Sequence, residues 1–266
     1  MWSKFGGSDP WETAVQFRHD ILDKDTFTCG NVQVEYLLNV ENNLQADKIH
    51  LVVERPDIWE VSLNGTKLNY TQDQLLDSRC GDFPVGDALK KGKNSILLTC
   101  CPMSIHAEIA PVMVVGGFGV KNAEKGFTLC DAPQELSLGA WKEQLYPEYP
   151  WEVSYSRTYT IKEQRDYVLQ LGSWQGTDAQ VWVNGEKVGI ASLPPYRMTL
   201  TPYLKEGENQ IEVRIIGSMK NLYGPHYAPL NGLMGPGHWN GVREQRAGQD
   251  YDLLPYGLEE EFKVLF

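Results

Sequence analysis

The chain has 266 residues, of which 42% are hydrophobic and 22% are charged, a composition typical of a globular protein. Its formal net charge is −11, and Lys and Arg form no cluster, which excludes a nucleic-acid groove and disfavours binding to an anionic membrane surface. A chain of this length holds one large domain or two of ordinary size.

The N-terminus and the cysteines bear on where the protein is found. Residues 1–7 have no apolar stretch of the kind found in signal peptides, although a piece cut from a longer polypeptide would lack one too. The longest weakly polar run, Ile109–Val120, is too short to span a bilayer. The five cysteines show no metal-site spacing, and their odd number leaves at least one thiol unpaired. These features favour a reducing, cytoplasm-like compartment over a disulfide-built secreted module.

In chain order, apolar residues at every second position first predict a strand over residues 31–40. Residues 49–53 form a second apolar run. The dipeptide Asn64-Gly65 then predicts a type I′ hairpin, because both residues tolerate the positive φ angles that this turn requires. A turn at Gly92-Lys93-Asn94 precedes a further strand at residues 95–99.

The same order of elements returns in the second half. Asn184-Gly185 predicts another hairpin, 120 residues after the first (184 − 64). A turn at Gly207-Glu208-Asn209 then precedes a strand in which Ile211 and Val213 alternate with charged residues. A repeat of this size indicates a duplicated domain rather than a solenoid. We therefore predict an all-β protein of two tandem, jelly-roll-like antiparallel β-sandwiches.

Two segments lack the strand pattern. Residues 134–151 are rich in aromatics but broken by prolines and a glycine, which predicts a strap between the sandwiches or, alternatively, part of a ligand surface. Residues 217–250 hold seven glycines and three prolines, and so long a connection is usually functional when it is ordered. The predicted domains are residues 1–132 and 153–266, joined by residues 133–152.

The second half resembles a known family. Val-Trp-Val-Asn-Gly at 181–185, followed by Val188-Gly189, Tyr196 and the turn and strand at 207–213, resembles the sugar-binding β-sandwich of family 2 glycoside hydrolases, a member of the galactose-binding-like jelly rolls. Residues 217–227 and 251–258 resemble the C-terminal regions of large α-L-rhamnosidase-like glycosidases. The resemblance implies a carbohydrate-binding or accessory region of a glycoside hydrolase. Its implied partners are carbohydrate and the catalytic barrel of a parent enzyme.

Nothing in the sequence points to a catalytic centre. The catalytic acids of family 2 enzymes lie on a (β/α)₈ barrel of about 250 residues, and this chain lacks the alternation of strands and helices that such a barrel needs. It has no Gly-x-Ser-x-Gly or HExxH motif and no P-loop. No cofactor is expected, although calcium held by backbone carbonyls stays open. Two alternatives remain: a structural or oligomerisation module without sugar binding, and a complete small hydrolase on a sandwich fold.

Loop residues supply the candidate sugar-binding groups. Aromatic rings stack on the C–H faces of sugars, and amide, imidazole and guanidinium groups bind hydroxyls. If the fold follows the jelly roll, the 217–240 segment should meet the loops that carry Trp174 and Tyr196. Replacing Tyr227 or Trp239 by Ala should then weaken sugar binding, unless these rings only anchor the loop. The candidates are Trp174, Tyr196, Asn221, Tyr223, His226, Tyr227, Trp239 and Arg243.

Overall fold

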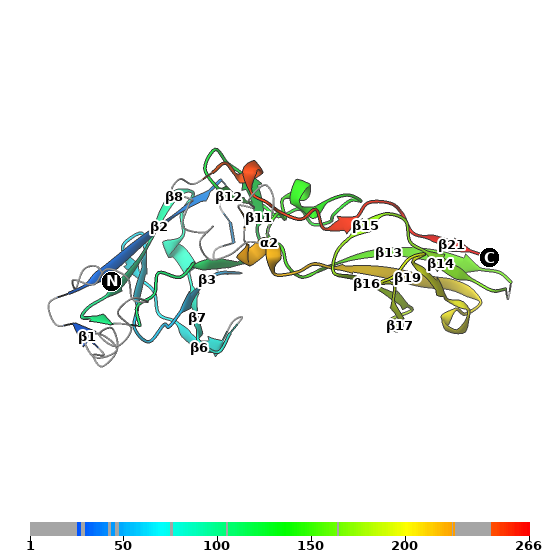
Figure 1. Cartoon of the computed structure of the whole chain (residues 1–266), viewed down its shortest axis with the longest axis horizontal. Helices are drawn as coiled ribbons and strands as arrows, with labels where there is room; N and C mark the ends of the chain where they lie inside the picture. The colour runs from blue at the N-terminus through cyan, green and yellow to red at the C-terminus, as the bar shows by residue number, and fades with distance from the viewer. Residues whose placement is uncertain are drawn as a thin grey trace, which may run out of the picture. The chain divides into compact units, whose positions relative to one another are not determined.

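The computed structural model describes residues 26–27, 30–41, 44–45, 48–74, 77–104, 106–163, 165–224, 226 and 246–266. These residues are almost entirely β, with most strands paired antiparallel, as the sequence predicts (Figure 1). Within this part of the chain no sheet closes into a barrel. The chain divides into two compact units: unit 1 is Met1–Phe118 with Thr128–Asp131, and unit 2 is Gly119–Phe127 with Ala132–Phe266.

Unit 1 is built on two main sheets. The first has the order β12-β2-β8-β4-β5, and the second has the order β10-β3-β7-β6. β1 and β9 form a separate two-stranded sheet. A 3₁₀ turn spans Gly86–Ala88. The strands are β1 (Thr26–Phe27), β2 (Val32–Val40), β3 (Ile49–Glu54), β4 (Glu60–Leu63), β5 (Thr66–Lys67), β6 (Thr71–Gln74), β7 (Cys80–Pro84), β8 (Gly92–Cys100), β9 (Met103–Ser104), β10 (Met113–Gly116) and β12 (Phe127–Cys130).

One core joins the two sheets of unit 1. Leu51 on β3 and Phe83 on β7 come from one sheet, whereas Leu63 on β4 and Ile96 on β8 come from the other, and all four are buried in a single hydrophobic cluster. Alternate residues of each strand face this cluster because successive side chains point to opposite faces of a sheet. Unit 1 is therefore a β-sandwich.

Unit 2 repeats this plan. One sheet has the order β13-β19-β16-β17 and another has the order β18-β14-β21, while β15 pairs with β20. Leu169 of β14 and Val181 of β16 are both fully buried in one core, so the two sheets pack face to face. The elements are β11 (Gly119–Asn122), β13 (Glu152–Ile161), β14 (Val168–Gln170), β15 (Trp174–Gln175), β16 (Asp178–Val183), β17 (Glu186–Ile190), β18 (Arg197–Thr199), β19 (Gly207–Ile216), β20 (Gly257–Leu258), β21 (Lys263–Leu265), the helix α2 (Lys220–Tyr223), and 3₁₀ turns at Trp141–Gln144, Thr201–Tyr203 and Gly248–Asp250.

Both predicted hairpins are confirmed. Asn64 and Gly65 have φ angles of 52° and 80° and join β4 to β5. Asn184 and Gly185 have φ angles of 51° and 84° and join β16 to β17. Two consecutive positive φ angles are the signature of the type I′ turn.

The aromatic segment before β13 packs within unit 2. Trp141 is 1% exposed and lies in the core of this unit, with Tyr146 and Tyr149 packed against it. Its backbone N–H donates to the carbonyl of Tyr256, and its indole N–H donates to the hydroxyl of Tyr155 at 2.8 Å. These contacts explain why a segment without strand periodicity is held in place. The predicted division into domains 1–132 and 153–266, joined by residues 133–152, stays a prediction.

Candidate functional site

Two of the residues expected from sequence meet in unit 2. Trp174 of β15 lies edge-on against Tyr196, with ring centroids 5.5 Å apart and planes at 69°. Tyr196 has a positive φ of 53°, and its carbonyl accepts the N–H of Leu171 at 3.1 Å, which fixes the turn that carries the ring. The indole nitrogen of Trp174 is buried and has no hydrogen-bond partner among the described residues.

Two further candidates lie in α2, and a third, His226, follows it. Asn221 is 2% exposed; its amide nitrogen donates to the carbonyls of Pro147 and Leu254, and its Oδ1 accepts the N–H of Leu254. His226 Nε2 donates to the carbonyl of Asn221 at 2.8 Å. The Asn221 amide is thus committed to the protein backbone, whereas Tyr223 is 55% exposed. Tyr227, Trp239 and Arg243 lie outside the described residues, so the full candidate cluster stays a prediction.

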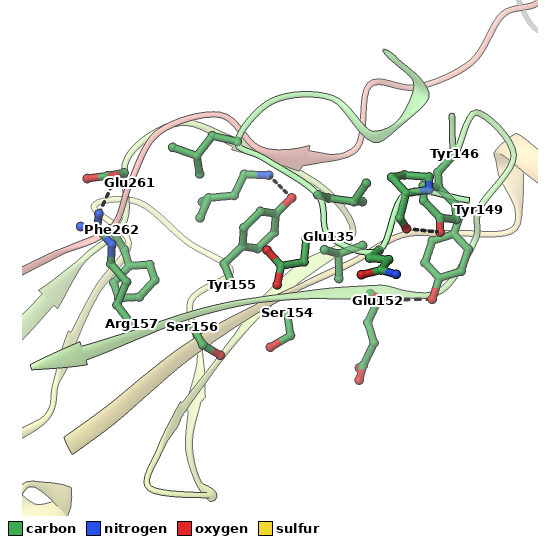
Figure 2. A pocket seen from close by; sticks show the side chains of 16 residues that line it. Glu135, Tyr146, Tyr149, Glu152, Ser154, Tyr155, Ser156, Arg157, Glu261 and Phe262 are labelled. Carbon is green, nitrogen blue, oxygen red and sulfur yellow. Dashed lines mark hydrogen bonds and ion pairs between the residues drawn. The ribbon is translucent and has the colours of Figure 1, made fainter. Parts of the chain in front are cut away.

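A groove of about 710 Å³ opens along β13 in unit 2 (Figure 2). One wall is the aromatic segment before β13, and another is the segment between β20 and β21. The lining combines rings, carboxylates, hydroxyls and one guanidinium, and consists of Pro133, Gln134, Glu135, Leu136, Leu138, Tyr146, Tyr149, Glu152, Val153, Ser154, Tyr155, Ser156, Arg157, Leu258, Glu261 and Phe262.

The groove follows the open edge of a sheet. Six consecutive residues of β13, from Glu152 to Arg157, line it, and β13 is the terminal strand of its sheet. Side chains from both faces of a strand reach one groove only where that groove runs beside the strand. Figure 2 shows Tyr155 on one side of β13 and the hydroxyls of Ser154 and Ser156 on the other.

The ladder shows which backbone groups of β13 face this groove. The N–H of Gly217 donates to the carbonyl of Trp151 at 2.7 Å, so Trp151 belongs to a hydrogen-bonded pair with β19. Such pairs alternate along an antiparallel ladder, and Ser154 and Ser156 therefore turn their N–H and C=O groups away from β19. The carbonyl of Glu152 has the same direction and accepts the hydroxyl of Tyr149 at 3.2 Å. The edge thus offers both donors and acceptors to a ligand.

The aromatic wall is held by its own contacts. The rings of Tyr146 and Tyr149 meet edge to face, with centroids 5.5 Å apart. The Tyr149 ring also contacts the Trp141 ring, with centroids 6.0 Å apart. Burial, with smaller contributions from the charges of Tyr146 and Glu152, raises the pKa of Tyr149, so this phenol stays neutral. The hydroxyl of Tyr155 accepts N–H groups from Trp141 and Leu258, and its own O–H has no acceptor among the described residues.

The charged groups of the groove are mostly acidic. Arg157 donates to Glu261 at 2.6 Å, although the two residues are 104 positions apart. Glu152 lies 3.4 Å from Arg214, which belongs to the neighbouring strand and does not line the groove. Glu135 is exposed and has no hydrogen bond or ion pair among the described residues. The arrangement provides flat apolar rings beside strong hydrogen-bond acceptors, a combination that suits ligands rich in hydroxyl groups.

Sequence reasoning found this site only in part. The aromatic and proline-rich segment at 134–151 carried a signal, and a ligand surface was one of its two interpretations. Ser154, Tyr155 and Ser156 carried none, because a strand at the edge of a sheet and a strand in its middle can show the same alternation.

Within the described ranges, no three or more His, Cys, Asp or Glu side chains lie close enough to hold a metal ion. Likewise, none of the described helices has the length and apolar character needed to cross a membrane.

Comparison with known proteins yields one match in sequence and several in structure. No family model matches the chain. A stretch of 66 residues is 42% identical to a beta-galactosidase of Priestia megaterium and covers 23% of this chain and 6% of that protein. The chain thus spans only a small part of this curated relative.

Among solved structures, a rhamnosidase from Novosphingobium sp. PP1Y aligns with a TM-score of 0.37 and 19% identity, over 97% of this chain and 26% of that chain. An alpha-L-rhamnosidase from Streptomyces avermitilis, complexed with L-rhamnose, aligns with a TM-score of 0.29 and 11% identity, over 75% of this chain and 24% of that chain. A beta-D-mannosidase from Dictyoglomus thermophilum aligns with a TM-score of 0.25 and 13% identity, over 71% of this chain and 24% of that chain.

Proposed function

We propose that this chain is a non-catalytic, galactose-binding-like accessory region of a glycoside hydrolase, and that unit 2 recognises a glycan through the groove along β13. The stretch that is 42% identical to a beta-galactosidase supports the first part of the proposal. The all-β architecture agrees with it, because the described strands belong to sheets that pack as sandwiches rather than to a (β/α)₈ barrel.

One observation carries the second part: the groove places aromatic rings, carboxylates and an open strand edge side by side. A sugar ring has an apolar face of C–H groups, which packs against rings such as Tyr149, and a rim of hydroxyls, which donate to carboxylates such as Glu135. Backbone groups of Ser154 and Ser156 add donors and acceptors at a rigid position. A region that holds a glycan in this way would help to position it for the catalytic barrel of a parent enzyme.

The pair formed by Trp174 and Tyr196 supports a second location for glycan binding. The rings are in contact, and the buried indole N–H of Trp174 has no partner among the described residues. This location includes the residues expected from sequence, and the experiment that tests the groove also distinguishes the two sites.

A glycan array followed by titration calorimetry with the best hit tests the proposal. If the groove is the site, Tyr149→Ala should weaken binding by roughly 1–2 kcal/mol, as expected for the loss of one aromatic contact. Tyr70→Ala, at an exposed tyrosine of unit 1 that does not line the groove, is the matched control and should bind as the wild type does.

Thermal unfolding of each variant shows that the fold is intact. A loss of binding in Trp174→Ala but not in Tyr149→Ala would move the site to the loops around Trp174 and Tyr196. An array without hits would contradict glycan recognition and favour a structural or oligomerisation module.

A further inference from the structure

We infer that the groove along β13 selects uncharged or amino-bearing glycans and excludes uronate and sulfated ones. This inference rests on the proposed glycan recognition and adds the chemical class of the ligand. It follows from the charges that line the groove and from the partners that each charge already has.

Carboxylates outnumber cations among the lining residues. Glu135, Glu152 and Glu261 contribute three negative charges, and Arg157 contributes one positive charge. Glu152 lies 3.4 Å from Arg214 and Glu261 pairs with Arg157, so Glu135 is the carboxylate that no described cation offsets. Among the described residues, no lysine or histidine lines the groove. The chain as a whole carries −11, so the long-range field has the same sign as the groove.

The one cation among the described lining residues, Arg157, is already paired. Arg157 Nη2 lies 2.6 Å from Glu261 Oε1, and both side chains are about half exposed, at 47% and 53%. Recognition of an anionic sugar relies on a guanidinium that can form two parallel hydrogen bonds with a carboxylate or sulfate group. Only Nη2 of Arg157 is used on Glu261, so an anion bound to the other N–H groups of Arg157 would lie beside the Glu261 carboxylate and be repelled by it.

The charge of Glu135 acts in the same direction. Glu135 has no partner among the described residues, and Figure 2 shows it on the same side of β13 as Tyr155, where a ring stacked on the wall would lie. Charges within one groove interact across less than the screening distance of about 10 Å at 0.1 M salt. A ligand carboxylate would be repelled there, whereas hydroxyl or ammonium groups would donate to Glu135.

The experiment is a glycan array that displays neutral, amino-bearing, uronate and sulfated glycans, probed with the whole chain at 50 mM and 500 mM NaCl. At low salt the hits should be neutral and amino-bearing glycans. Hits confined to acidic glycans would overturn the inference and leave glycan recognition standing. An array without any hit would contradict the proposed function and the inference together.

Two substitutions test the cause of the selection. Glu135→Lys adds a cation at an exposed position, and Glu261→Gln releases Arg157 from its partner. Each should raise binding of acidic glycans relative to neutral ones by roughly threefold or more at 50 mM NaCl, and the gain should shrink at 500 mM as screening increases.

Glu186→Lys makes the same change of charge as Glu135→Lys on β17, the strand at the opposite end of the sheet, and should leave the preference unchanged. An equal effect of Glu186→Lys would assign the selection to net charge rather than to the groove and would overturn the inference.

Discussion

The side-chain amide of Asn184 donates a hydrogen bond of 2.9 Å to Oδ1 of Asn209. This bond ties the tip of the hairpin between β16 and β17 to the turn that begins β19. Asn209 is 1% exposed, and it also binds the backbone N–H and C=O of Lys205 and the carbonyl of Gly207. One buried amide therefore fixes a hairpin and a turn at the same time.

Unit 1 contains the same arrangement. Asn64 donates to Oδ1 of Asn94 at 2.8 Å, and Asn94 binds the N–H and C=O of Lys90 and the carbonyl of Gly92. Asn94 is likewise 1% exposed. The repeat recognised in the sequence is thus a repeat of a hydrogen-bonded network, which explains why the two asparagines recur with the hairpins.

Replacing Asn209 by Ala should lower the free energy of unfolding of unit 2 by roughly 1–3 kcal/mol, because the backbone groups of Lys205 and Gly207 lose the partner that a buried side chain supplies. Urea unfolding followed by tryptophan fluorescence measures the change. Asn209→Asp keeps the acceptor used by Asn184 but places a carboxylate oxygen against the carbonyls of Lys205 and Gly207, so its loss should be at least as large as that of Asn209→Ala. A stability within about 0.5 kcal/mol of wild type for Asn209→Ala would show that the network is not stabilising.

If the two units fold independently, thermal unfolding should show two transitions. Asn94→Ala should lower the midpoint of one and Asn209→Ala that of the other, because each network lies within a single unit. Differential scanning calorimetry of the whole chain checks this expectation. A single transition shifted equally by both substitutions would mean that the units unfold as one cooperative structure.

Gly257→Ala should destabilise unit 2 by roughly 2 kcal/mol or more. A Cβ at this position would lie 2.2 Å from the carbonyl oxygen of Gly139, and the φ of 150° is unfavourable for any residue with a side chain. Gly185→Ala is the matched control, since it also has a positive φ but no atom within 4 Å of the added Cβ. In urea unfolding, Gly257→Ala should be clearly less stable than Gly185→Ala. Equal losses of stability would mean that backbone strain, rather than the close approach of Gly139, causes the destabilisation.

Glu148 makes stability depend on pH. Burial raises its pKa from 4.5 to about 7. Below pH 4.5 both the folded and the unfolded chain keep the proton, whereas between pH 4.5 and 7 the unfolded chain releases it first. The raised pKa therefore lowers the free energy of unfolding as pH rises from 4.5 to about 7. Above pH 7 this loss of stability stays constant.

Glu148→Gln removes this penalty. At pH 8 the variant should be more stable than wild type by on the order of 2 kcal/mol, and at pH 4.5 the two should be nearly equal. Urea unfolding at both pH values measures the difference. Glu143→Gln, at an exposed position in the same segment, is the control and should show no such pH-dependent gain. A gain of equal size at both pH values would assign the effect to something other than ionisation.

The parts of this fold that depend on residues adjacent in the chain could be predicted from sequence. The Asn64-Gly65 and Asn184-Gly185 hairpins were predictable because their positive φ angles are a property of those residue types. The strand at Val32–Val40 was predictable because alternation with a period of two reports one buried face. Prediction and structure agree less well in segments without a regular apolar pattern. The helix α2 lies inside a segment that was expected to be an irregular loop.

The sequence by itself determined the all-β class, the turns and the internal repeat, because each follows from local backbone preference and from the period of the apolar residues. The tertiary structure alone decided that β13 is an edge strand, that Trp141 packs in the core of unit 2, and that Arg157 pairs with Glu261. The physical reason is that strand order and long-range pairing depend on which distant surfaces bury one another. Alternation along a single strand looks the same whether its edge is paired or open, so the groove along β13 could be recognised only once the sheet was assembled.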